Sequence, residues 1–171
     1  MRNWFSAGFL EMRHLIRILC ISLSLAATAD ATPIVFIVRH AEKAPTDGND
    51  PGLSAAGQNR AKALARILKD SQITTVFVTE FKRTQETAAP TAKEAHLTPI
   101  VIPANEMAGL AAKVRALSGN ALVVSHGNAI PDLMKALGIA MPVVIPEEDY
   151  SEIFAVSLFD PPQLLRLHYP F

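Results

Sequence analysis

The sequence predicts an α/β fold, with a mostly parallel central sheet, helices on both faces and an antiparallel edge formed by a C-terminal hairpin. Two observations predict this class. Short apolar runs rich in β-branched residues alternate with segments of helical period through most of the chain. The last two apolar runs follow each other with no helix between them, which is typical of an antiparallel pair.

The first predicted strand covers 34–38 and has the composition of a strand that is buried on both faces. Its five residues are all apolar, and each is β-branched or aromatic. Arg39 and His40 follow directly. In open α/β sheets, ligands bind just beyond the carboxyl ends of the strands, so a reactive loop is expected here.

A loop and a helix come next in the chain. Residues 44–52 are dense in Pro, Gly, Asp and Asn and predict a loop. Ser54 fits the N-cap of a helix over 55–69, where apolar residues recur at helical spacing. Gly57 is unfavourable in the first turn of a helix and indicates that another segment approaches that turn closely.

The remaining elements repeat this alternation. Further strands are predicted over 73–79, 99–102, 121–124, 153–159 and 164–169, and helices over 83–96, 106–117 and 131–137. The first of these helices is expected to continue or kink at Pro90. Asn105 is the predicted cap of the second, and Gly138 is expected to end the third.

The N-terminal segment is predicted to be a secretory signal peptide over residues 1–31, with Met12 as an alternative start. Arg13 and Arg17 precede a short apolar run, and small residues near Ala29 offer a cleavage pattern. A membrane span needs roughly 20 apolar residues, so this run is too short. We therefore expect an exported protein, periplasmic or secreted, whose residues 32–171 form one domain without stable membrane insertion.

Charge and cysteine content limit the function classes. The formal net charge of the 171 residues is +0, and no basic run is present, which argues against nucleic acid as a partner. The single cysteine, Cys20, lies inside the predicted leader. The processed protein would therefore have neither disulfide nor thiol chemistry.

Charged side chains follow three of the predicted strands. Arg39 and His40 follow the first, Arg83 comes soon after the second, and His126 follows the fourth. In a parallel sheet these ends share one rim. Guanidinium groups match phosphate oxygens in geometry and charge, and nearby cations favour the neutral, nucleophilic form of an imidazole. We interpret the set as a phosphoryl pocket with a histidine nucleophile. Since no cluster of carboxylates accompanies it, a metal site fits poorly.

Four segments resemble the motifs of the histidine phosphatase superfamily, in the order that the family has them. They are Arg39–Lys43 (its Arg-His-Gly signature), Leu53–Gln58 (Leu-Thr/Ser-x-x-Gly), Thr79–Ala88 (Ser-x-x-x-Arg-x-x-x-Thr) and Val123–Asn128 (the second histidine). The resemblance implies a phosphoglycerate mutase-like fold. It also implies that His40 forms a phosphohistidine, that Arg39, Arg83 and His126 hold the phosphoryl oxygens, and that no cofactor is needed.

Two features depart from the family pattern or stay open. Ala41 replaces the family's glycine, and an alanine fits if its φ is negative, giving a slightly tighter loop with intact chemistry. The proton donor for the leaving group is not fixed by the sequence. Glu106, Glu42 and Glu80 all compete for it, and a good leaving group such as phosphohistidine would need no acid.

The function expected from the sequence is an exported phosphatase acting on phosphate monoesters or on a phosphorylated macromolecule. The chain is compact and resembles the small phosphohistidine phosphatases, and it lacks the insertions of a mutase. An alternative is a non-catalytic module that keeps the pocket to bind phosphorylated ligands. A metal-binding protein is a third class, and stoichiometric zinc after purification would identify it.

Overall fold

The computed structural model describes residues 32–45 and 48–170, so the predicted signal peptide lies outside the described residues. Within the described part, the strands are β1 (Ile34–Arg39), β2 (Ile73–Val78), β3 (Ile100–Val101), β4 (Asn120–Ser125), β5 (Glu152–Ser157) and β6 (Gln163–His168). The helices are α2 (Ala55–Leu68), α3 (Lys82–Glu94), α4 (Met107–Arg115) and α5 (Ile130–Ala136).

The six strands form one sheet in the order β3-β2-β4-β1-β5-β6. The first four in this order are mutually parallel, whereas β5 runs antiparallel to β1 and β6 antiparallel to β5. The predicted fold class is confirmed. Strands β1 and β4 lie at the centre, so their carboxyl ends meet in the middle of one rim.

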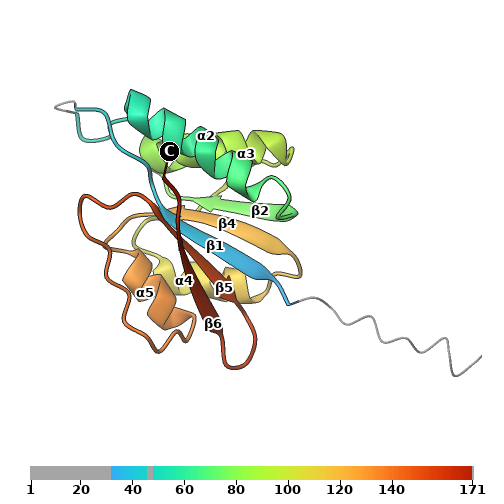
Figure 1. Cartoon of the computed structure of the whole chain (residues 1–171). Coiled ribbons are helices and arrows are strands. Elements are labelled where there is room, and N and C mark those ends of the chain that lie inside the picture. The colour runs from blue at the N-terminus through green and yellow to red at the C-terminus, as the bar shows by residue number, and fades with distance from the viewer. Residues whose placement is uncertain (1–31, 46–47, 171) are drawn as a thin grey trace, which may run out of the picture. The chain divides into compact units, whose positions relative to one another are not determined.

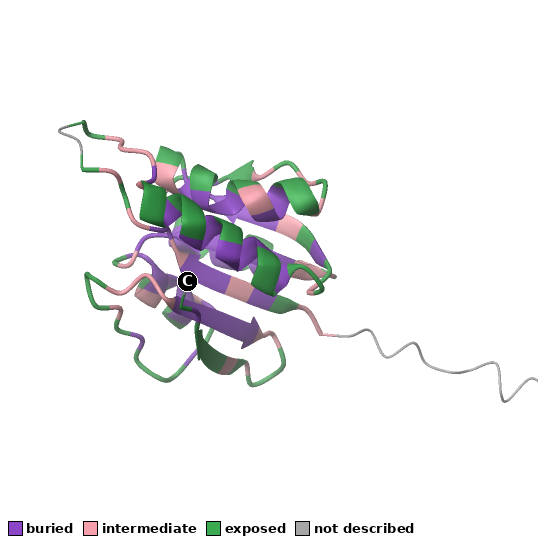
Figure 2. Ribbon diagram, turned by 45° about the horizontal axis from the view of Figure 1, so that its top comes forward, coloured by how far each residue is buried: buried purple, intermediate pink, exposed green. Residues whose placement is uncertain are grey.

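Helices cover both faces of the sheet, α2 and α3 on one and α4 and α5 on the other (Figure 1). Successive strand residues alternate between the two cores, because side chains of a strand point to opposite faces. Ile37 packs in the core beneath α4 and α5, and Val38 in the core beneath α2 and α3. Figure 2 shows the result, with buried strands between helices whose outer sides are exposed.

Two helices differ from their predicted bounds or character. Helix α3 runs through Pro90 as one helix, and its buried residues Ala88, Thr91 and Ala92 pack on either side of the proline. The structure places the N-cap of α4 at Glu106, so the prediction of Asn105 was wrong, and the helix ends at Arg115. Glu106 makes no side-chain capping hydrogen bond, and the C-cap residue is Ala116, so the local sequence does little to fix where α4 begins and ends.

Two glycines act as the sequence predicted. A Cβ on Gly57 would lie 2.2 Å from the carbonyl oxygen of Glu42, so the first turn of α2 indeed packs directly against the loop after β1. Ser54 caps this helix by accepting from the Gly57 N–H at 3.1 Å. Gly138 follows α5 with a φ of +82°, a conformation that favours glycine.

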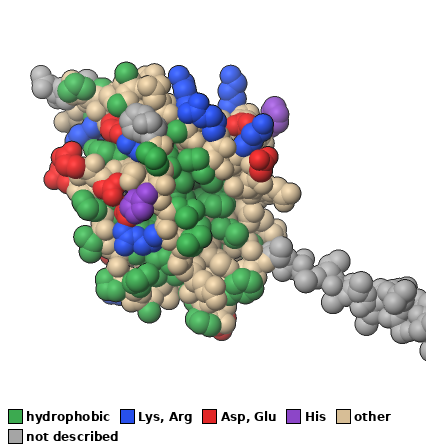
Figure 3. All heavy atoms as spheres, in the orientation of Figure 1, with side chains coloured by type: hydrophobic (Ala, Val, Ile, Leu, Met, Phe, Trp, Pro, Cys, Tyr) green, Lys and Arg blue, Asp and Glu red, His purple; other side chains and the backbone are tan. Residues whose placement is uncertain are grey.

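On the side of α2 and α3, the two helices do not cover the whole sheet. Phe36, Ala155 and Leu165 are cross-strand neighbours of β1, β5 and β6, and Leu165 and Leu167 are exposed. Figure 3 shows hydrophobic side chains gathered in the middle of this face of the molecule.

In the described part of the chain, no helix combines the length and apolar character that crossing a membrane requires.

Candidate active site

Segments far apart in the sequence meet at the carboxyl ends of the parallel strands. Arg39 ends β1 and pairs in register with Ser125, the last residue of β4. His40 and His126 therefore follow neighbouring strands, and their ring centroids lie 5.4 Å apart. Arg83 lies in the first turn of α3. All four line one pocket, here called the phosphoryl pocket, whose other residues are Gly127, Asn128, Ile145 and Glu147.

His40 presents one ring nitrogen to this pocket. Its Nδ1 lies 2.8 Å from the carbonyl oxygen of Ala41, which can only accept, so Nδ1 carries the proton and Nε2 keeps its lone pair. Burial, with smaller contributions from Arg83, His126 and Arg39, lowers the pKa of His40 to about 4 despite the opposing bond to Ala41. The ring is therefore neutral near pH 7, as a nucleophile must be.

His126 has the opposite tautomer. Its Nδ1 lies 3.5 Å from Nη2 of Arg83, which can only donate, and its Nε2 lies 3.0 Å from Oγ1 of Thr79. The neutral ring thus carries its proton on Nε2 and turns Nδ1 towards Arg83. Burial, then Arg83, lower the pKa of His126 to about 4, and Glu80 opposes this shift. The ring of Phe81 packs edge-on against it at 5.2 Å.

Arg39 is held by the loop that precedes β5. Its Nη1 donates to the carbonyl oxygens of Pro146 (3.0 Å), Asp149 (3.2 Å) and Glu147. The ring of Tyr150 lies 4.2 Å from the guanidinium carbon, and Nε of Arg39 is buried without a protein partner. One edge of the guanidinium is therefore occupied by the loop, and Nε keeps an unused N–H at the pocket.

Arg83 is held less tightly. It lies 3.9 Å from a carboxylate oxygen of Asp50, and its guanidinium carbon stands 4.4 Å from the centre of the Phe81 ring. An ion pair at that distance is weak when it is partly exposed. The two arginines, with two neutral histidines between them, make a cationic pocket that suits a phosphoryl dianion.

The loop after β1 fits an alanine, as predicted. Among the described residues other than glycine, only Gln72 and His96 have a positive φ, so Ala41 needs no glycine conformation. Its N–H donates to Oγ1 of Thr87 at 2.9 Å, and that hydroxyl in turn donates to the carbonyl oxygen of Arg83 at 2.7 Å. One buried hydroxyl thus joins the loop that carries the nucleophile to the helix that carries Arg83.

None of the three predicted proton donors lines the phosphoryl pocket. Glu42 pairs with Arg60 through both of its oxygens, at 2.7–3.0 Å. Glu106 is exposed at the start of α4. Glu80 accepts from the Ala104 N–H at 2.9 Å, and it is the carboxylate whose charge reaches His126.

Sequence reasoning gave no role to several residues that the structure places at the site. Tyr150 stacks on Arg39, and Glu147 lines the pocket. The buried hydroxyls of Thr79, Thr84 and Thr87 belong to a segment that the sequence did single out. The signal in the sequence was the position of these threonines before and after Arg83, because a buried threonine hydroxyl needs a hydrogen-bond partner.

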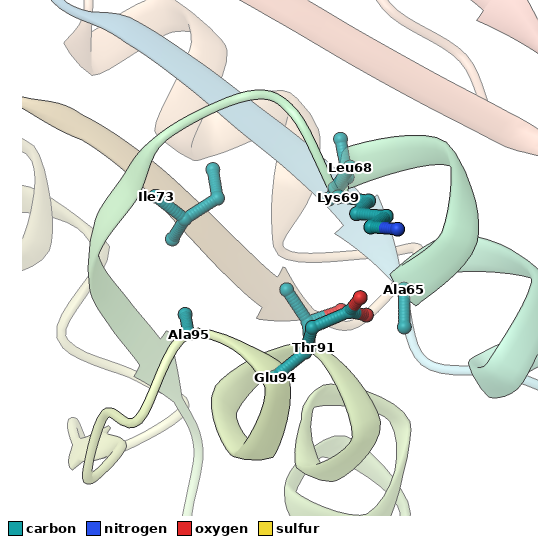
Figure 4. Close-up of a pocket in the computed structure, with 7 residues that line it drawn as sticks. All are labelled: Ala65, Leu68, Lys69, Ile73, Thr91, Glu94 and Ala95. Atoms are coloured by element: carbon teal, nitrogen blue, oxygen red, sulfur yellow. The ribbon is translucent and has the colours of Figure 1, made fainter.

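A second hollow lies between α2 and α3 and shares no residue with the phosphoryl pocket. Figure 4 shows its lining, which is Ala65, Leu68, Lys69, Ile73, Thr91, Glu94 and Ala95. It contains neither arginine nor histidine, so it lacks the groups that phosphoryl chemistry needs.

Comparison with known proteins agrees with the geometry. The family model of the histidine phosphatase superfamily (branch 1) matches residues 35–111, which include His40 and Arg83. The match covers less than half of the chain, and it supports the resemblance to the histidine phosphatase superfamily that the sequence indicated. The His40 and Arg83 segments lie within the match, and His126 lies beyond its end.

Solved structures of phosphatases share the fold of this chain. The protein histidine phosphatase SixA, in a complex with tungstate, has a TM-score of 0.68 and 23% identity, over 79% of this chain and 96% of that one. A mycobacterial glucosyl-3-phosphoglycerate phosphatase has a TM-score of 0.61 and 17% identity, over 74% and 90% of the two chains. Among curated proteins, no match was found.

Proposed function

We propose that the chain is a phosphatase that hydrolyses phosphate monoesters, or a phosphorylated macromolecule, through a phosphohistidine on His40. One observation carries the proposal: Nε2 of His40 is free, because Nδ1 is held by the Ala41 carbonyl, and it faces a pocket with two arginines. The structural neighbours are phosphatases by name, one of histidine-phosphorylated protein and one of a sugar phosphoglycerate.

The reaction has two displacements at phosphorus. Nε2 of His40 attacks phosphorus, and the bond to the leaving oxygen breaks with its electron pair on that oxygen, which takes a proton from solvent. Water then attacks phosphorus and loses one proton to solvent. The bond from phosphorus to Nε2 breaks with its electron pair on Nε2, which releases inorganic phosphate and restores the neutral ring. Arg39, Arg83 and His126 stabilise the charge on the equatorial oxygens in both steps.

The covalent intermediate is the test of this proposal. Rapid acid-free quenching of the enzyme with ³²P-labelled phosphate donor should trap an acid-labile, base-stable adduct that is absent in His40→Ala. The matched control is His168→Ala, because His168 is an exposed histidine outside the pocket. Turnover of an aryl phosphate by His40→Ala at the wild-type rate would overturn the proposal.

A second candidate, the binding module, is favoured by one observation. None of the predicted proton donors Glu42, Glu80 and Glu106 lines the pocket, and the one carboxylate in its lining is Glu147, to which the sequence gave no catalytic role. This candidate predicts binding of inorganic phosphate without turnover of any ester. Comparison of p-nitrophenyl phosphate with an alkyl phosphate separates the two, because the aryl ester needs no acid and the alkyl ester does.

We also propose that the protein is exported. The support is the pattern of residues 1–31 described above, with Arg17 before the apolar run. The test is the mass of the N-terminus of protein recovered from the periplasm or the medium. An intact N-terminus on a cytosolic protein would contradict the proposal.

A further inference from the structure

We propose that Thr79 is a positioning residue for phosphoryl transfer: its hydroxyl fixes the His126 ring with Nδ1 towards the phosphoryl group. The role rests on the phosphatase function proposed above. The hydroxyl serves His126 both before and after Nδ1 takes up a proton, so the ring does not turn during the reaction.

The contacts of Thr79 are buried and specific. Thr79 directly follows β2 and is 2% exposed, and its Oγ1 lies 3.0 Å from Nε2 of His126. The same oxygen lies 3.0 Å from Oγ1 of Thr84, which is fully buried in the first turn of α3. Solvent therefore cannot replace this hydroxyl as a partner of the imidazole without a rearrangement.

The neighbours of Thr79 fix the direction of its hydrogen bonds. Oγ1 of Thr84 donates to the carbonyl oxygen of Phe81 at 2.8 Å, so its lone pairs are left to accept the Thr79 hydroxyl proton. The Thr79 oxygen is then an acceptor for the Nε2 proton of His126. Arg83 leads to the same assignment from the other side, because its Nη2 can only donate to Nδ1.

This arrangement lets Nε2 of His126 keep its partner when the ring changes protonation, whereas Nδ1 exchanges the N–H of Arg83 for a phosphoryl oxygen. When a phosphate monoester enters as the monoanion, its proton can pass to Nδ1, which then donates to a phosphoryl oxygen of the resulting dianion. The proton on Nε2 stays there throughout and is donated to Oγ1 of Thr79. The imidazolium is thus hydrogen-bonded at both nitrogens beside a dianion, and the proton returns to phosphate when the product leaves as the monoanion.

A purely structural role for Thr79 is the competing explanation. Its N–H donates to Oγ1 of Thr84 at 3.1 Å, which links β2 to the start of α3. Replacement by valine keeps this backbone bond and the side-chain volume but removes the hydroxyl, together with its contacts to His126, to Thr84 and to the Phe81 N–H at 3.4 Å, so readouts specific to His126 are needed beside the rate.

The kinetic test uses p-nitrophenyl phosphate with the full chain. Thr79→Val should lower kcat about tenfold and change KM less than about twofold, because charge on the phosphoryl oxygens is greatest in the transition state. Thr79→Ser should restore kcat to within about threefold. Thr91→Val is the matched control, since Thr91 is a buried threonine whose hydroxyl has no partner and lies in the second hollow.

Two further readouts separate positioning from folding. Loss of the Nε2 acceptor disfavours the imidazolium, so the alkaline limb of the kcat profile should move to lower pH in Thr79→Val. Side-chain ¹⁵N spectra of His126, with and without inorganic phosphate, should show one tautomer in the wild type and a mixture in Thr79→Val. An unchanged alkaline limb or unchanged ¹⁵N spectra in Thr79→Val would overturn the proposal.

The outcome for Thr79 can be distinguished from the outcome for the enzyme. If the wild type turns over no ester, the proposed function fails, and the ¹⁵N spectra alone still decide whether Thr79 sets the tautomer of His126. If the wild type is active and Thr79→Val behaves like Thr91→Val, the function stands and the positioning role is wrong.

Discussion

Two regions supply residues to the phosphoryl pocket and hold them in different ways. One region is the ends of β1 and β4, and the other is the loop over 142–150. His40 continues the sheet ladder, because its N–H donates to the Ser125 carbonyl at 2.9 Å, directly beyond the pairing of Arg39 with Ser125. The loop has no such ladder. It meets the pocket through its carbonyl contacts with Nη1 of Arg39 and through Tyr150. The difference implies that the sheet fixes the chemistry, whereas the loop can adjust binding.

The largest effect on activity should come from a change at the ends of β1 and β4. His126→Gln removes the ring that Thr79 and Arg83 orient, and kcat should fall about 100-fold or more, as when one donor to a developing charge is lost. Steady-state kinetics with p-nitrophenyl phosphate measure it. Retention of more than about a third of wild-type kcat would show that His126 does not take part.

His40, at the end of β1, should also make the stability of the protein depend on pH. The folded pKa of His40 is about 4 against 6.5 for the free side chain, so between these values the unfolded chain binds more protons. Stability from this group is fully present above pH 6.5 and is lost as pH falls towards 4. The loss should be about 1–3 kcal/mol.

Chemical denaturation at pH 7 and pH 5 checks this dependence. The drop in unfolding free energy should be smaller in His40→Gln than in the wild type. The exposed His168 provides the control, since His168→Gln should keep the wild-type drop. An equal drop in His40→Gln would mean that His40 titrates normally in the folded protein.

A change in the loop over 142–150 should affect substrate binding more than the chemical step. Tyr150→Leu removes the ring that lies 4.2 Å from the Arg39 guanidinium, a contact worth about 1 kcal/mol, so KM should rise about fivefold while kcat stays near wild type. Kinetics over a range of substrate concentrations separate the two constants. A fall in kcat larger than the rise in KM would place the loop within the chemical step.

The smallest effect should come from the charge at the mouth of the pocket. Glu147→Gln should improve kcat/KM about threefold for a substrate with a second anionic group, such as 3-phosphoglycerate, relative to p-nitrophenyl phosphate. Glu148→Gln is the matched control, since it removes the same charge from a neighbour that does not line the pocket. Equal ratios in both variants would mean that Glu147 does not select substrates.

The sequence predicted those parts of the site that follow from the sheet. Apolar strands with charged ends were enough to bring Arg39, His40 and His126 to one rim, since parallel strands share a carboxyl edge. Gly57 was predictable for a similar reason, because glycine in a first turn marks close contact. Each of these predictions depended on short-range pattern and on one rule of topology.

Long-range side-chain pairing was beyond such reasoning. Glu42 finds Arg60, 18 positions later, because α2 folds back onto the loop after β1, and nothing in the local pattern of either residue predicts it. Tyr150 reaches Arg39 from more than 100 positions away for the same reason. The identity of the proton donor depends on where such side chains point in the folded protein, which is why the sequence could not fix it among Glu106, Glu42 and Glu80.

The shared hydroxyl of Thr87 has a mechanical consequence. Because one oxygen accepts from the Ala41 N–H and donates to the Arg83 carbonyl, the nucleophile's loop and the arginine's helix are coupled through a single atom. These two bonds oppose any motion that separates the loop after β1 from the first turns of α3. They therefore help to keep the nucleophile and the arginine at a constant spacing.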